Sequence, residues 1–165
     1  MWILVTGGAG FIGSAVVRQL LLDPKLSVVN VDKLTYSGNL DSLPEMPNRN
    51  RYAFENADIC DAVAMGRIFK KYTPRFVMHL AAESHVDRSI DAPDDFIRTN
   101  IIGTYSLLKA AKKIWIDEPK ANGEAPLKHR FHHVSTDEVY GELGPNDPAF
   151  TEDTAWIGLL CQKMK

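Results

Sequence analysis

Short apolar runs alternate along the chain with segments whose apolar residues recur at helical spacing. Five of these runs are rich in β-branched or aromatic residues and predict strands: residues 1–6, 26–31, 51–57, 75–82 and 130–135. Helical spacing predicts helices over residues 14–22, 61–72 and 92–116, with Asp61 as the cap of the second and Pro93 near the start of the third. This alternation is typical of an α/β protein, and we expect a doubly wound parallel sheet in the strand order 3-2-1-4-5.

A glycine-rich turn joins the first predicted strand to the first predicted helix. Gly7, Gly10 and Gly13 stand in a G-x-x-G-x-x-G spacing. The first glycine of such a turn allows a tight bend, the second lets the backbone approach a pyrophosphate, and the third lets the helix pack close to the strand. The amides and the dipole at the helix start then favour phosphates. We therefore expect a Rossmann-like dinucleotide site, with simple turn chemistry as the alternative.

An acid, Asp32, follows the second predicted strand. It lies about 20 residues beyond the glycines, where a carboxylate binds the ribose hydroxyls of adenosine. Its charge repels a 2′-phosphate, so NAD is favoured over NADP, although the neighbouring Lys33 partly offsets that repulsion. Residues 35–50 are rich in Ser, Gly, Asn and Pro, and we expect a loop there that reaches over the nucleotide.

Thr136, Asp137 and Glu138 follow the fifth predicted strand. An acid beside a potential base at the carboxyl end of a strand predicts paired proton transfer, because the ligands of such sheets bind at that edge. The alternative interpretation is an exposed acidic turn. Residues 83–88, which include His85, follow the fourth strand in the same way and predict either a solvated loop or part of a substrate site.

Length and composition narrow the class of protein. A chain of 165 residues with a net charge of −2 fits one domain that buries a core without disulfides or metals. No basic patch with interleaved aromatics indicates nucleic acid, and no apolar run reaches the roughly 18 residues of a membrane span. No basic segment precedes the apolar start, so we expect no signal peptide and a cytoplasmic protein.

Cys60 and Cys161 are expected to be reduced thiols. No metal is expected, since His132 and His133 are neighbours in a strand and point to opposite faces.

Four blocks of sequence resemble the dTDP-glucose 4,6-dehydratase family within the extended short-chain dehydrogenases/reductases. They are residues 6–13, 32–40, 80–90 and 135–141, and the resemblance covers residues 2 to about 153. The glycine block is typical of the whole superfamily, whereas the last two blocks are specific to the dehydratases. The resemblance implies NAD as cofactor, a dTDP-sugar as substrate, and a homodimer in the family, which is doubtful for this chain.

The resemblance also implies roles for single residues. The implied NAD contacts are Phe11, Ile12, Asp32, Lys33, Leu34, Thr35, Asp58, Ile59, Leu80, Ala81, Ala82, Glu83, Ser84 and Thr99. Ser84 and Thr136 are implied to bind the substrate, with Asp137 as proton donor and Glu138 as proton acceptor. Oxidation at carbon 4 acidifies the hydrogen on carbon 5, which Glu138 removes while Asp137 protonates the oxygen leaving carbon 6. These opposite roles need a protonated Asp137. We expect burial near the sugar and the nicotinamide to raise its pKa and keep it protonated.

The chain departs from the family pattern after Glu152. The family's Tyr-x-x-x-Lys pair does not follow the fifth predicted strand, and residues 153–165 read DTAWIGLLCQKMK where its helix is expected. We interpret residues 1–152 as an NAD-binding Rossmann domain and residues 153–165 as an atypical tail of a truncated or frame-shifted product that lacks the substrate domain. Three hypotheses remain: a dehydratase by family, a catalytically inactive NAD-binding module, or a sugar-nucleotide epimerase or reductase, against which Asp137 and Glu138 argue. The choice between a dTDP-sugar and a UDP-sugar stays open.

Overall fold

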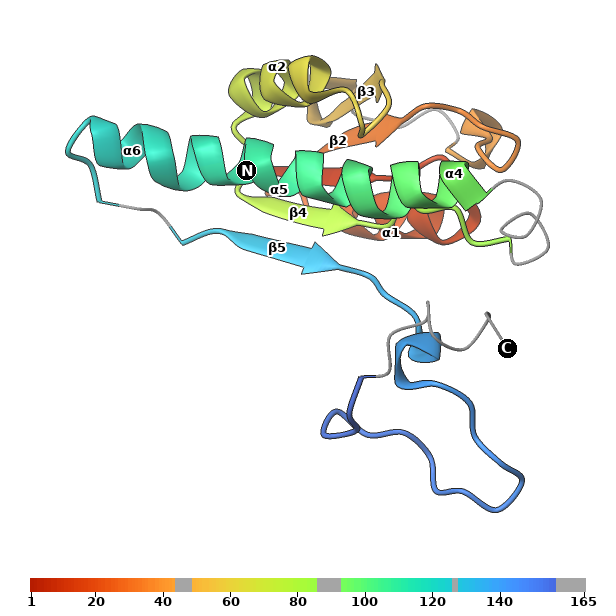
Figure 1. Ribbon diagram of the computed structural model, residues 1–165. Helices are drawn as coiled ribbons and strands as arrows, with labels where there is room; N and C mark the ends of the chain where they lie inside the picture. Colours follow the sequence, from red (N-terminus) through yellow and green to blue (C-terminus); the bar gives the residue numbers. More distant parts are fainter. Residues whose placement is uncertain (44–48, 86–92, 126–127, 157–165) are drawn as a thin grey trace. The chain divides into compact units, whose positions relative to one another are not determined.

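A computed structural model describes residues 1–43, 49–85, 93–125 and 128–156 of the chain. The chain divides into two compact units, Met1–His133 and Val134–Lys165 (Figure 1). The first unit holds the sheet and its helices, and the second holds Thr136, Asp137 and Glu138. The expected domain boundary at residue 152 stays a prediction.

Five parallel strands form the sheet of the first unit. They are β1 (Trp2–Thr6), β2 (Ser27–Asp32), β3 (Tyr52–Asn56), β4 (Phe76–His79) and β5 (Arg130–His133). Their order is β3-β2-β1-β4-β5, which confirms the predicted α/β topology.

Strand β4 ends at His79, so the prediction of a strand through residue 82 is wrong. His79 pairs with Thr6, the last residue of β1, and the chain then turns away at Gly7 with a φ of +70°. The Leu80 amide still donates to the Thr6 carbonyl oxygen at 3.2 Å, but residues 81–82 lie beyond the end of β1 and do not continue the strand pairing. Strand β5 ends at His133 for the same reason, because its pairing with β4 stops at His79.

The helices confirm two predicted segments and correct a third. They are α1 (Phe11–Leu21), α2 (Ala62–Tyr72), α4 (Pro93–Phe96), the π-helical η3 (Ile97–Gly103), α5 (Thr104–Lys112), the π-helical η4 (Lys113–Asp117) and α6 (Glu118–Ala121). Asp61 caps α2 as predicted, since its Oδ1 accepts the Val63 and Ala64 amides at 2.9 and 3.0 Å. The third helical run continues past Ile116 to Ala121. Pro119 is compatible with this extension because it lies in the first turn of α6.

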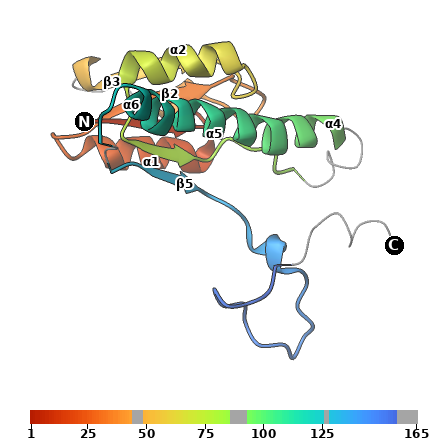
Figure 2. The ribbon, with the colours of Figure 1, turned by 60° about the vertical axis from the view of Figure 1, so that its left-hand side comes forward.

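Helices cover both faces of the sheet (Figure 2). On one face, Leu4 packs in a core with Phe69 of α2 and Leu107 of α5. On the other face, Val5 packs with Val17 of α1. Neighbouring residues of β1 thus face opposite helical layers, which is why the strands read as continuous apolar runs.

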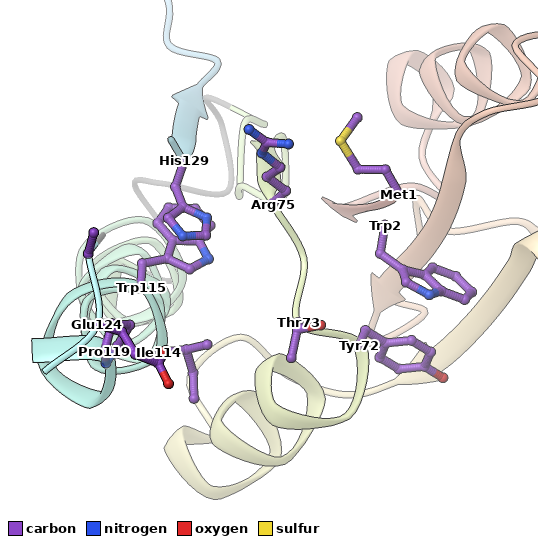
Figure 3. A pocket seen from close by; sticks show the side chains of 11 residues that line it. Met1, Trp2, Tyr72, Thr73, Arg75, Ile114, Trp115, Pro119, Glu124 and His129 are labelled. Carbon is purple, nitrogen blue, oxygen red and sulfur yellow. The ribbon is translucent and has the colours of Figure 1, made fainter. Parts of the chain in front are cut away.

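A pocket of about 400 Å³ lies where the amino ends of the strands begin (Figure 3). Met1, Trp2, Arg75, Trp115 and His129 are among its lining residues. The Trp115 indole stacks on the His129 ring at 4.7 Å, and its Nε1 donates to the Pro74 carbonyl at 2.8 Å. This region lies at the edge of the sheet opposite to the glycine turn.

Candidate functional site

The carboxyl ends of β1 to β4 meet at one edge of the sheet, and most of the predicted site residues follow these ends. Thr6 of β1 pairs with Val31 of β2 and with His79 of β4, while Asp32 pairs with Asn56 of β3. The glycine turn, residues 32–35, residues 58–59 and residues 80–84 therefore emerge from neighbouring strands. Ligands of doubly wound sheets bind where the strand order reverses, which here is between β1 and β4.

The glycine turn is too crowded for side chains at two of the three predicted glycines. A Cβ atom on Gly7 would lie 2.8 Å from the Ala81 nitrogen, and one on Gly13 would lie 2.0 Å from the Gly7 carbonyl oxygen. The spacing did not single out Gly8, where a Cβ atom would lie 2.2 Å from Asn30 Oδ1. Gly10 is less crowded, because a Cβ atom on it would lie 3.2 Å from the Gly7 carbonyl oxygen. Its expected role, to let the backbone approach a pyrophosphate, stays a prediction.

The start of α1 presents open backbone donors. Gly10 caps the helix without a side chain, and the first turn holds no acid. Among the described residues, nothing accepts the amides of Phe11, Ile12 and Gly13, whereas the Ser14 amide bonds to the Gly10 carbonyl at 2.9 Å. The Phe11 and Ile12 side chains are 94% and 63% exposed. Unpaired amides at the positive end of a helix dipole favour an anion.

Asp32 joins the glycine turn to the end of β2. Its Oδ2 accepts the Ala9 amide and its Oδ1 accepts the Leu34 amide, both at 2.9 Å. Leu34 has a φ of +54°, a left-handed conformation that a non-glycine residue rarely adopts and that often occurs at functional sites. Each carboxylate oxygen keeps a second acceptor position, so Asp32 can also bind hydroxyl groups.

The loop after Asp32 returns to the glycine turn, as the Asn39 amide donates to the Ala9 carbonyl at 2.9 Å. It includes the short 3₁₀ helices η1 (Leu40–Ser42) and η2 (Arg49–Arg51). Residues 44–48 of the predicted loop lie outside the described residues.

Lys33, Asp58 and Thr99 form a polar cluster beside the same edge. Lys33 Nζ lies 3.6 Å from Asp58 Oδ2 and 3.4 Å from Thr99 Oγ1. Burial raises the pKa of Asp58, but hydrogen bonds from Cys60 and the charges of Lys33 and Arg98 outweigh it, so the net pKa lies below its ordinary value. The ionised Asp58 therefore offsets the Lys33 charge, which weakens the argument that Lys33 would attract a 2′-phosphate.

The backbone of the segment after β4 is held by hydrogen bonds to the side chains of Thr6 and Asn100. The Leu80 and Ala81 amides each lie 3.2 Å from Thr6 Oγ1. The Asn100 side chain binds Glu83 twice, accepting its amide and donating to its carbonyl, both at 2.9 Å. Asn100 lies in the π-helical segment η3, and π-helical turns are frequent at functional sites. The sequence analysis did not predict a role for Asn100. Its polar side chain between Thr99 and two isoleucines was the signal that could have indicated one.

Other predicted residues of this edge differ in exposure. Ile59 is buried, and a Cβ atom on Gly103 would lie 2.6 Å from its Cδ1, so it contributes to the core. Ala82, Ser84 and His85 are exposed, as a substrate-binding segment requires. Residues 86–88 of the predicted polar run lie outside the described residues.

The second unit contains the predicted acid and base. Thr136 precedes the 3₁₀ helix η5 (Asp137–Tyr140), and its Oγ1 accepts the Glu138 amide at 3.3 Å. Thr136, Asp137 and Glu138 are all exposed. Asp137 is therefore exposed among the described residues, and its burial near the sugar and the nicotinamide stays a prediction.

A Tyr-x-x-x-Lys spacing does occur elsewhere, at Tyr105 and Lys109 of α5. Lys109 Nζ lies 5.7 Å from the centre of the Tyr105 ring, and both side chains are exposed. Their neighbours Ser106 and Leu107 are buried. The pair precedes β5, so it does not occupy the position that the family resemblance implies for the catalytic pair.

Within the described part of the chain, no group of three or more His, Cys, Asp and Glu is arranged to hold a metal ion. None of the helices described is long and apolar enough to cross a membrane. Cys60 is a free thiol whose Sγ lies 3.1 Å from the Arg98 carbonyl oxygen, and Cys161 lies outside the described residues.

Known proteins resemble the chain in both sequence and fold. The dTDP-glucose 4,6-dehydratase of Shigella flexneri is 60% identical over 164 residues, which covers 94% of this chain and 45% of that protein. A dTDP-glucose 4,6-dehydratase of Streptomyces venezuelae, solved with NAD bound, superposes with a TM-score of 0.79 at 40% identity over 95% of this chain and 45% of that one. A UDP-glucose 4-epimerase of Thermus thermophilus, solved with NAD, superposes with a TM-score of 0.77 at 30% identity. The match covers 95% of this chain and 44% of the epimerase.

The chain thus spans a little under half the length of the curated relatives that it matches. The family model described as GDP-mannose 4,6 dehydratase matches residues 4–158, from β1 to beyond η5. The match covers most of the chain and all of its sheet except Trp2 and Ile3, so the chain belongs to the GDP-mannose 4,6 dehydratase family.

Proposed function

We propose that this chain is the NAD-binding part of a dTDP-glucose 4,6-dehydratase, a lyase that converts dTDP-glucose to dTDP-4-keto-6-deoxyglucose with loss of water. The observation that carries the cofactor assignment is the meeting of the glycine turn, Asp32 and residues 80–84 at the point where the strand order reverses. The 60% identity to the Shigella flexneri enzyme supports the choice of reaction.

The residues at this edge fit a dinucleotide. The open amides at the start of α1 suit the pyrophosphate, and Asp32 suits the hydroxyls of the adenosine ribose. Lys33 is already paired with Asp58, which favours NAD over NADP. The remaining implied contacts, from Leu80 to Ser84 and at Thr99, lie along the neighbouring strand end and the π-helical turn.

The proposed reaction needs an acid and a base beside the sugar. NAD, when bound, supplies the redox chemistry by taking a hydride from carbon 4 and returning it to carbon 6. The proton of the carbon-4 hydroxyl would go to the tyrosine of the Tyr-x-x-x-Lys pair, which the remaining part of the proposed protein supplies. Glu138 removes the proton from carbon 5, which the carbon-4 ketone makes acidic, and Asp137 gives a proton to the oxygen that leaves carbon 6 as water. Glu138 would return its proton to carbon 5 when the hydride returns to carbon 6. Ser84 and Thr136 hold the sugar through their hydroxyls.

The second candidate is a sugar-nucleotide epimerase, because an NAD-bound epimerase has the same fold. Asp137 and Glu138 argue against it, since epimerisation at carbon 4 needs no elimination acid and base. A third candidate, an NAD-binding module without activity, applies to the chain by itself.

Calorimetric titration with NAD and with NADP tests the cofactor assignment. We expect NAD to bind more tightly, because Asp32 repels a 2′-phosphate and Lys33 is paired. Tighter binding of NADP would contradict the proposal, and binding of neither would contradict the dinucleotide site itself.

A fusion of residues 1–152 to the remaining part of the Shigella flexneri relative tests the reaction. We expect this fusion to form the keto-sugar from dTDP-glucose. The Glu138→Gln variant should oxidise carbon 4 and accumulate NADH without eliminating water, whereas Glu142→Gln, a control at another exposed acid of the same unit, should turn over normally. Normal product formation by Glu138→Gln would exclude Glu138 as the base.

The proposed whole protein acts in the cytoplasm and pairs with a second copy of itself. Apolar side chains on the outer surface of the long helical run support this pairing, since Ile97, Ile101 and Tyr105 are 48%, 55% and 60% exposed. Sedimentation of the fusion and of the 165-residue chain tests it, and a monomeric fusion would contradict it.

A further inference from the structure

Both ring nitrogens of His79 are bonded to threonine hydroxyls inside the first unit. Its Nδ1 lies 2.7 Å from Thr6 Oγ1, and its Nε2 lies 2.9 Å from Thr104 Oγ1. His79 is 1% exposed and Thr6 is fully buried. The imidazole therefore connects the end of β1, the end of β4 and the start of α5.

The direction of each of these hydrogen bonds follows from the supply of donors. Thr6 Oγ1 accepts the Ala81 amide and shares the Leu80 amide with its own carbonyl oxygen, all at 3.2 Å. Both lone pairs of Thr6 Oγ1 are then used, so its hydroxyl hydrogen points to His79 Nδ1. The single ring proton is left on Nε2 and is donated to Thr104, whose own hydroxyl donates to the Asn100 carbonyl at 2.7 Å.

The two ends of this chain of hydrogen bonds act on the same segment. At one end, Thr6 holds the Leu80 and Ala81 amides. At the other end, Thr104 binds the backbone of Asn100, whose side chain binds Glu83 through two bonds of 2.9 Å. His79 is the link between these anchors.

We propose that His79 is a positioning residue of the cofactor cleft: as the neutral Nε2–H tautomer, it completes a directed hydrogen-bond chain from Thr6 to Asn100 that fixes residues 80–84 against the glycine turn. The proposal rests on the proposed function in one respect, namely that residues 80–84 border the NAD site.

The surroundings keep the ring neutral. Burial, and to a lesser extent the nearby His133, lowers the pKa of His79 to about 4. The His133 ring on β5 lies 5.0 Å from the His79 ring, and the uncharged Phe131 ring lies 6.0 Å away. A protonated ring would place two hydrogens between Nδ1 and Thr6 Oγ1, which would break the chain at that bond.

The tautomer can be measured in the unmodified 165-residue chain. Long-range ¹H–¹⁵N correlation spectra distinguish a protonated Nε2 from a protonated Nδ1 in each imidazole. We expect His79 to carry its proton on Nε2 at neutral pH. The Nδ1–H tautomer, or rapid exchange between both, would overturn the proposal without any substitution that endangers folding.

Affinity for NAD separates a positioning role from a general effect on stability. His79→Gln keeps a donor near Thr104 but loses the acceptor for Thr6, and we expect NAD to bind about tenfold more weakly, the effect of one buried hydrogen bond. The matched control is Trp115→Phe, which removes the bond to the Pro74 carbonyl at the opposite edge. It should lower stability but leave NAD affinity unchanged. Unchanged affinity in His79→Gln, or equal weakening in the control, would overturn the proposal.

A third measurement decides the matter if the chain binds no NAD. Hydrogen exchange of the Leu80, Ala81 and Glu83 amides reports the order of this segment directly. We expect His79→Gln and Thr104→Val to speed exchange at these amides, and Trp115→Phe not to. Unchanged exchange would overturn the positioning role, whereas absence of NAD binding in the unmodified chain would contradict only the proposed function.

Discussion

Gly13 and Gly66 both lie in helices, yet the structure assigns them opposite responses to an added methyl group. A Cβ atom on Gly13 would lie 2.0 Å from the Gly7 oxygen, whereas one on Gly66 of α2 meets nothing within 4 Å. We predict that Gly13→Ala lowers the free energy of unfolding by about 2 kcal/mol through overpacking. Gly66→Ala should raise it by about 0.5 to 1 kcal/mol, because alanine favours a helix interior. Urea unfolding of both variants tests this, and equal changes would contradict it.

The Asp32 carboxylate holds the Ala9 and Leu34 amides. Replacing it by alanine removes the acceptor for the ribose hydroxyls and releases the turn. NAD binding should weaken by about 1.5 to 3 kcal/mol, which calorimetry measures. Asp41→Ala, a change at an exposed acid of the following loop, is the control and should leave the affinity unchanged. Equal affinity in Asp32→Ala would place the ribose elsewhere.

At the scale of elements, Glu55 fastens α2 to β3. Its carboxylate accepts hydrogen bonds from Lys71 Nζ at 2.8 Å, Tyr72 hydroxyl at 2.7 Å and Arg67 Nη2 at 2.9 Å. Burial opposes ionisation of Glu55, but the bonds from Lys71, Tyr72 and Arg67 outweigh it and lower its pKa to about 2 from 4.5. The ionised carboxylate is therefore favoured in the folded state.

This lowered pKa predicts a loss of stability in acid. A carboxylate with a depressed folded pKa stabilises fully above its unfolded pKa, here near 4.5, and its contribution disappears as the pH falls towards about 2. The contribution should be about 2 kcal/mol near pH 6, after allowance for the solvent around Lys71 and Arg67. We predict that the gap in unfolding free energy between the natural chain and Glu55→Gln narrows between pH 6 and pH 3. A constant gap would contradict the assignment.

At the scale of the whole molecule, we predict that the 165-residue chain alone does not convert dTDP-glucose to the keto-sugar. No Tyr-x-x-x-Lys pair follows its fifth strand, and the chain spans 45% of the Shigella flexneri relative. Positioned proton transfer typically supplies a factor of about 100 to 10,000, and orientation of the sugar supplies more. Product assays on the chain and on the fusion test this, and robust turnover by the chain alone would show that another residue replaces the tyrosine.

Local patterns predicted the elements well because strands and helices differ in their apolar period. All five strands, their order and the Asp61 cap are confirmed. Boundaries were less predictable, since they depend on neighbours distant in sequence. Strand β4 ends at His79 because β1 turns at Gly7, and the long helical run passes Ile116 through π-helical turns that no apolar period predicts.

The sequence by itself determined the doubly wound topology, the glycine turn, Asp32 at the end of β2 and the placing of Asp137 beside Glu138, because each follows from patterns among residues that are close in the sequence. Only the tertiary structure decided that Lys33 pairs with Asp58, that His79 joins Thr6 to Thr104, and that Asn100 holds Glu83. These contacts join residues that are far apart in the sequence, and a hydrogen bond depends on distances of a few tenths of an ångström. Packing of the two helical layers on the sheet sets those distances, and no local period encodes them.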